Sequence, residues 1–192
     1  LGSAPQPRGD RLGDDADAEA TIAALNAAIA GLDRDDNPAE WADAQSALGV
    51  VLLTSGMKQT GNERLVQGEA ALRAAAGIRS RESAPAEWAR IQNRLGLTVY
   101  MQGMRDPDGR RIRESLSHFD ASLEERPRDR VPMDWAQSES NRALVLSTLG
   151  QRSGDAALMN EAVESYREVL KVYTREATPM LWAESQANLG NL

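Results

Sequence analysis

Apolar residues along this chain recur with the period of an amphipathic helix, and no segment shows the strict alternation of a half-buried strand. Behind Pro38, the residues Trp41, Leu48 and Leu52 fall on one helical face, at spacings of seven and four. A short polar stretch follows, and a second stripe then runs through Leu65 and Leu72 at the same kind of spacing. The pattern predicts a pair of helices joined by a turn. We call the first the A helix and the second the B helix.

The pair is repeated along the chain. Each tryptophan lies 47 residues from the next, follows a proline by three positions and is followed at once by alanine; the four are Trp41, Trp88, Trp135 and Trp182. Such regularity indicates tandem duplication of one structural unit. In this register we expect a B helix at 15–33, A–B units at 38–80, 85–127 and 132–174, and a last A helix at 179–192. Residues 1–14 are expected to be a tag remnant and a disordered linker.

The expected core follows the same register. We expect it to contain the four tryptophans, the leucines Leu48, Leu95 and Leu189, and the glycines Gly49, Gly96 and Gly190. Glycine inside a helix costs about 1 kcal/mol relative to alanine. Its recurrence therefore indicates a position where the missing side chain lets the B helix approach closely. We call such a position a notch. Glycines in register at Gly56, Gly103 and Gly150 suit helix C-termini.

These positions resemble the tetratricopeptide repeat (TPR) family, in a long bacterial-type variant. Leu48 and Gly49 match its Leu-Gly pair, and Gly68, Leu72 and Ala75 fall on its A-x3-F-x2-A pattern. The resemblance covers 15–192. It implies an all-α, right-handed α-solenoid of antiparallel helix pairs, about eight helices in all, whose A helices line a concave, ligand-contacting face. Two features depart from the family pattern. The tryptophan of each unit lies one turn earlier than usual, and glutamines occupy the family's tryptophan position. HEAT-type repeats remain an alternative.

Composition narrows the function classes. The net charge is −7, which disfavours binding to nucleic-acid backbones, although the segment 73–130 is locally basic, with 12 basic and 9 acidic residues. The absence of cysteine excludes disulfides and thiolate chemistry. No apolar run approaches the roughly 20 residues that span a bilayer. We expect a cytoplasmic protein by default, with neither membrane nor nucleic-acid partners.

Catalytic and metal-binding patterns are not found in the sequence. His118, the only histidine, has no second ligand type near it, so a surface or inter-helix role is expected. The segment from Asp33 to Asn37 lacks the glycine and glutamate of a calcium loop and is interpreted as a turn and cap. Arg126, Arg128 and Arg130 are interpreted as solvated surface. We expect no cofactor, no metal and no enzyme activity.

A second stripe on the A helices is the candidate binding surface. By the family resemblance, it would line a peptide-binding groove formed by Arg90, Asn93, Arg94, Leu97, Tyr100, Asn141, Val50 and Leu53. Arg90 and Arg94 could bind a peptide carboxylate or an acidic side chain through charge-assisted hydrogen bonds. In the plainer alternative, the stripe packs on the next repeat and the arginines are solvated.

The leading hypothesis is a non-catalytic scaffold that binds a protein or peptide. The alternative is a self-assembly module of a larger multidomain protein, in which unpaired terminal helices stack end to end. A catalytic domain is the third and weakest class.

Overall fold

In a computed structural model, the chain is all-helical across residues 8–192, with side chains described from residue 15, and no strand occurs in that range. The helices are α1 (Arg8–Gly31), α2 (Pro38–Met57), α3 (Glu63–Ile78), α4 (Pro85–Met104), α5 (Arg110–Glu124), α6 (Pro132–Ser153), α7 (Ala156–Val169) and α8 (Pro179–Gly190). The even-numbered helices are the expected A helices. The chain from Arg8 to residue 14, expected to be linker, is instead the first part of α1, and residues 1–7 lie outside the described range.

Each A helix begins at the proline of the repeat. Proline suits the first helical position because its missing N–H would have no intrahelical partner there. The amide N–H of the residue before it closes a turn by donating to the backbone oxygen four positions back, as in Asn37 N to Asp33 O at 2.8 Å and Thr178 N to Thr174 O at 2.9 Å. The repeat therefore encodes a fixed entry into every A helix.

An arginine lies over the ring of each tryptophan, and the sequence analysis missed this pairing. The guanidinium carbon lies 5.1, 5.6, 4.8 and 5.8 Å from the ring centroid in the pairs Arg34–Trp41, Arg81–Trp88, Arg128–Trp135 and Arg175–Trp182. These are cation–π distances. The signal was present in the sequence, since each arginine stands seven residues before its tryptophan.

The chain divides into two compact units, the first ending at Ile78 and the second beginning at Arg79. In the first unit, α2 packs against both α1 and α3. Its core is formed by Leu48, Leu52 and Ala71, and Ile22 and Leu25 of α1 pack against them with Ile29.

In α2 and α4, the glycine at the first register position allows close approach of the B helix, as the register predicted. A methyl group at Gly49 would lie 2.5 Å from Leu72 Cγ, and one at Gly96 would lie 2.8 Å from the Phe119 ring. A methyl group added at Gly190 would meet no atom of another described helix within 4 Å, and this glycine is exposed.

The glycines at the other register position lie in the last turns of their helices, as expected, but they are not C-terminal caps. Gly56, Gly103 and Gly150 lie inside their helices and do not have the left-handed conformation of a C-terminal cap. They again allow close approach: a methyl group on Gly103 would lie 2.5 Å from Ile112 N.

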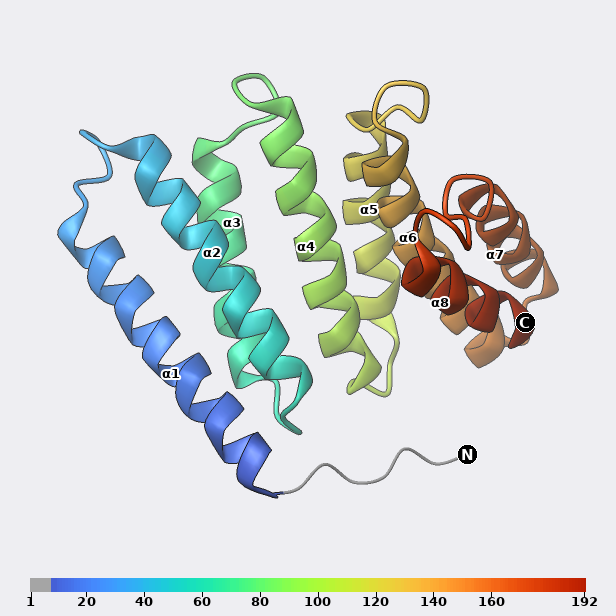
Figure 1. Cartoon of the computed structure of the whole chain (residues 1–192), viewed down its shortest axis with the longest axis horizontal. Helices are drawn as coiled ribbons and strands as arrows, with labels where there is room; N and C mark the ends of the chain where they lie inside the picture. The colour runs from blue at the N-terminus through green and yellow to red at the C-terminus, as the bar shows by residue number, and fades with distance from the viewer. Residues whose placement is uncertain (1–7) are drawn as a thin grey trace. The chain divides into compact units, whose positions relative to one another are not determined.

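The second unit contains α4 to α8, with successive helices in contact and with α4 also touching α6 (Figure 1). One cluster of buried residues contains Tyr100, Ile112, Phe119, Val145 and Leu149. Another contains Ala136, Val169 and Tyr173, with Trp135, Val172 and Trp182 packed against it.

The residues expected in the core differ in their burial. Leu48 and Leu95 are buried, whereas all four tryptophans and Leu189 are only half-buried. A half-buried indole leaves one ring face for the arginine that stacks on it.

Candidate functional site

The second unit contains a groove with a volume of about 460 Å³. Its walls come from three successive A helices, α4, α6 and α8, together with one residue from each of the turns that precede α6 and α8. Five of the predicted groove residues line it: Arg90, Asn93, Arg94, Leu97 and Asn141. The sequence stripe therefore did identify residues that lie together.

The α4 wall carries positive charge. Arg90 is exposed, and Arg94, one turn further along, is half-buried. Burial lowers the pKa of Arg94 below its ordinary value, and repulsion from Arg90 and Arg126 lowers it further. Leu97 adds an apolar surface beyond the two guanidinium groups.

Arg126, which was expected on the solvated surface, is buried in this groove with only 4% of its area exposed. Its Nη1 donates to the backbone oxygen of Asp134 at 3.2 Å and to Ser138 Oγ at 2.9 Å. Burial lowers the pKa of Arg126, the Asp134 carboxylate opposes that shift, and Arg90 adds to it. The expectation was wrong because burial here depends on α6, which no local pattern around residue 126 reveals.

The other two members of that arginine-rich turn behave differently. Arg128 stacks on Trp135 and forms an ion pair with Glu168 at 2.6 Å, while Arg130 is exposed as expected.

Amide side chains join the α4 and α6 walls. Asn141 Nδ2 donates to Asn93 Oδ1 at 3.1 Å, and Asn93 is itself buried. Further along the same two helices, the hydroxyls of Tyr100 and Thr148 share a hydrogen bond of 3.0 Å. These bonds hold the two walls in register along their length.

The opposite side of the groove is acidic. Asp134 of α6 and Glu184 of α8 line it and are exposed, whereas Tyr173 and Ser185 line it and are buried. Burial raises the pKa of Tyr173 to about 12, and the carboxylates of Glu184 and Asp134 add to the effect. Both carboxylates therefore lie near the phenol.

Three predicted groove residues lie elsewhere. Tyr100 does not line the groove and belongs to the buried cluster around Phe119. Val50 and Leu53 belong to the first unit: Val50 borders a smaller cavity of about 310 Å³ beside Asp15 and Lys58, and Leu53 is buried.

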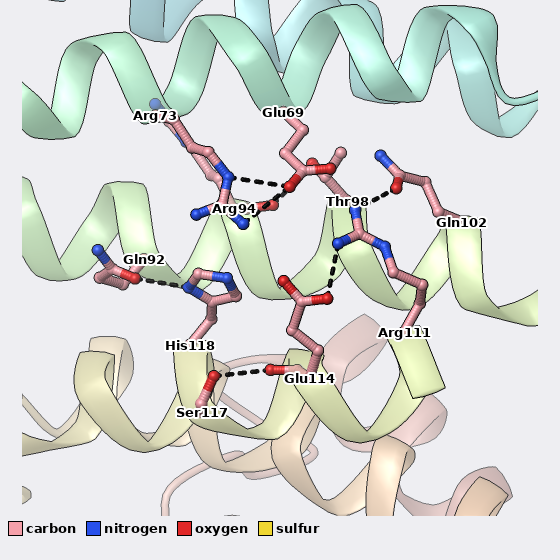
Figure 2. Close-up of polar contacts among 10 residues, drawn as sticks. All are labelled: Glu69, Arg73, Gln92, Arg94, Thr98, Gln102, Arg111, Glu114, Ser117 and His118. Carbon is pink, nitrogen blue, oxygen red and sulfur yellow. Dashed lines mark hydrogen bonds and ion pairs between the residues drawn. The ribbon is translucent and has the colours of Figure 1, made fainter. Parts of the chain in front are cut away.

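His118 serves as an inter-helix residue. Its Nδ1 lies 2.7 Å from Oε1 of Gln92, which joins α5 to α4 (Figure 2). Figure 2 also shows Arg111 of α5 beside Gln102 of α4 and beside Glu114, the latter at 2.6 Å. Glu139, at the register position of Gln92, likewise accepts a hydrogen bond from Ser165 of α7. The glutamine slot of the repeat thus makes polar contacts from A helix to B helix.

Glu139 and Arg142 of α6 form an ion pair, but a long one, at 3.7 Å. Arg142 forms closer ion pairs with Asp120 of α5 at 2.7 Å and with Glu161 of α7 at 2.5 Å. Its main role is therefore to join three helices of the second unit.

The groove offers guanidinium and amide hydrogen-bond donors beside carboxylate acceptors, with some apolar surface between them. These groups suit non-covalent recognition of charged ligands. Within residues 15–192, no cluster of histidine or carboxylate side chains is arranged to hold a metal ion. None of the helices in the described part of the chain is long and apolar enough to cross a membrane.

In comparisons with known proteins, no protein-family model matches this chain, and no curated protein or solved structure is a significant match to it.

Proposed function

We propose that this chain is a non-catalytic scaffold that binds an acidic segment of a protein or peptide in the groove of the second unit. The observation that carries the proposal is the convergence of Arg90, Arg94 and Arg126 on one concavity of about 460 Å³. Clefts of roughly 300–1,000 Å³ are typical of ligand sites. Buried polar side chains in the lining give such a site fixed hydrogen-bonding positions.

Electrostatics favour an anionic occupant. Three guanidinium groups repel one another, and burial adds a desolvation cost for Arg94 and Arg126. A carboxylate in the groove would offset both effects and would form charge-assisted hydrogen bonds. Part of the binding free energy of an acidic ligand would then come from reducing the repulsion between the arginines and from offsetting their desolvation cost in the unliganded protein.

The proposed architecture is a TPR-like right-handed solenoid in which the A helices line the concave face. Its support is the repeat register: helices begin at prolines 47 residues apart, and an arginine–tryptophan stack recurs before every A helix. A groove walled by three successive A helices is what this arrangement would produce.

Binding of an acidic peptide tests the function. We expect a fluorescein-labelled, acetylated and amidated peptide containing Glu-Glu between glycines to bind in fluorescence anisotropy at 50 mM salt. Arg90→Ala combined with Arg94→Ala should weaken binding about tenfold or more, because charge-assisted hydrogen bonds to two guanidiniums are lost.

Arg113→Ala is the matched control, since Arg113 is an exposed arginine on the B helix α5 and does not line the groove. It changes the net charge of the protein without changing the site. Equal weakening by Arg113→Ala and by a single Arg90→Ala would indicate general charge attraction and would contradict the proposed site. A lack of binding to any acidic peptide would contradict the function.

A second candidate function is self-association through α8, on which Met180 is 82% exposed and Leu181 is 39% exposed. The open notch at Gly190 supports it, because the equivalent notches at Gly49 and Gly96 each hold a B-helix side chain. Light scattering after gel filtration over a hundredfold concentration range tests it. A constant monomer mass would rule this candidate out.

A further inference from the structure

One register position of the repeat changes charge from helix to helix across the groove. Arg90 on α4, Gln137 on α6 and Glu184 on α8 occupy equivalent places, 47 residues apart, and all three line the groove. At this register position the charge is therefore positive on α4, absent on α6 and negative on α8.

Neighbouring residues strengthen the gradient at both ends. Arg94 and Arg126 add positive charge on the α4 side. On the other side, Glu184 lies near Tyr173, and the Asp134 carboxylate of α6 interacts with both Tyr173 and Arg126. Within residues 79–192, neither Asp134 nor Glu184 forms an ion pair with a side chain of the protein.

Buried polar groups are built into each side. Arg126 is 4% exposed on the positive side, and Tyr173, at the equivalent position one repeat later, is 3% exposed on the negative side. Ser185 is 2% exposed beside Tyr173. Side chains buried to this extent hold their polar atoms in place. Arg126 is therefore a fixed positive charge on one side, and Tyr173 and Ser185 are fixed hydrogen-bonding groups beside the exposed Glu184 on the other.

Building on the proposed function, we infer that the groove recognises a dipolar peptide segment, in which an acidic residue contacts the arginines of α4 and a basic residue contacts Glu184 and Asp134. An acidic residue alone satisfies only one wall. The change of charge from α4 to α8 across the groove also sets the orientation of the peptide, because the reverse orientation brings like charges together.

The test compares three acetylated, amidated and fluorescein-labelled peptides, of which the second and third each differ from the first at one pair of positions. The first contains Glu-Glu-Gly-Lys-Lys between glycines, the second replaces both lysines by glutamine, and the third replaces both glutamates by glutamine. Anisotropy titrations at 50 mM salt should rank the dipolar peptide first, about fivefold or more tighter than the glutamate-only peptide. The lysine-only peptide should bind more weakly than the dipolar one.

Glu184→Gln separates the inference from simple charge attraction. Glu184 is exposed and forms no ion pair within residues 79–192, so we expect the substitution to preserve the fold. It should weaken binding of the dipolar peptide about three- to fivefold and leave the affinity for the glutamate-only peptide unchanged or slightly higher. Glu164→Gln on α7, which removes the same charge from an exposed residue outside the groove, is the control.

Each outcome decides a separate point. Equal affinity for the dipolar and glutamate-only peptides in the wild type overturns the dipolar inference and leaves the proposed function standing. Equal effects of Glu184→Gln and Glu164→Gln on the dipolar peptide also overturn it. If none of the three peptides binds, both the inference and the proposed function fail.

Discussion

A single glycine position controls how closely an A helix meets its B helix. At Gly96 the facing side chain is Phe119, which is fully buried, whereas at Gly190 the space beyond the Cα is open. The two glycines occupy equivalent register positions two repeats apart. The same substitution at both positions therefore separates the steric effect from helix propensity.

Gly96→Ala should destabilise the second unit by about 1–3 kcal/mol, because the added methyl group meets a ring in a filled core. Gly190→Ala should be neutral or stabilising by up to about 1 kcal/mol, since alanine favours the helix and nothing obstructs it. Urea unfolding followed by circular dichroism measures both. Equal destabilisation by the two substitutions would contradict the notch.

At the scale of the helix, the A helices and the B helix α7 begin in different ways. The A helices begin at proline and have no side-chain cap, as at Asn37 before α2. The B helix α7 is capped instead: Asp155 Oδ1 accepts from Ala157 N at 2.9 Å and from Leu158 N at 3.4 Å. The negative charge of a carboxylate there also interacts favourably with the positive end of the helix dipole.

Asp155→Ala should therefore lower the free energy of unfolding by about 1 kcal/mol, within the usual range of about 0.5–2 kcal/mol for loss of a cap. Asn37→Ala is the control, because its side chain makes no capping hydrogen bond, and it should change stability by less than about 0.5 kcal/mol. Chemical denaturation at neutral pH gives both values. A larger loss from Asn37→Ala than from Asp155→Ala would contradict this account of how the two helices begin.

The elements that the sequence predicted best are those with local signals. The start of every A helix was predicted at the correct proline because proline and the repeat register act within a few residues. The five groove residues on α4 and α6 followed from the repeat register of the A helices together with the family resemblance. Arg126 was missed because its partners come from α6, and α1 extends back to Arg8 where composition had suggested a linker. Arg126 and Tyr173 occupy equivalent positions one repeat apart, and this register was the sequence signal that could have placed both residues in the groove.

At the scale of the whole molecule, each helix of the second unit is supported mainly by its neighbours along the chain. Stability in such an array is approximately a sum of local and nearest-neighbour terms, so a defect at one end has effects that fade with distance along the array. A single cooperative globule would behave differently, because one substitution would speed every globally protected amide by the same factor.

Trp182→Ala distinguishes the two cases. Trp182 packs against Val169 and Tyr173, so its removal should loosen α7 and α8. Hydrogen exchange measured by mass spectrometry should accelerate in 156–190 and stay within about twofold of wild type in α2 and α3. Met180→Ala, at a residue that is 82% exposed, should leave exchange unchanged throughout and serves as the control. Uniform acceleration across α2 to α8 would contradict nearest-neighbour stabilisation and, with it, the proposed solenoid, because the end of an array cannot destabilise distant repeats as strongly as adjacent ones.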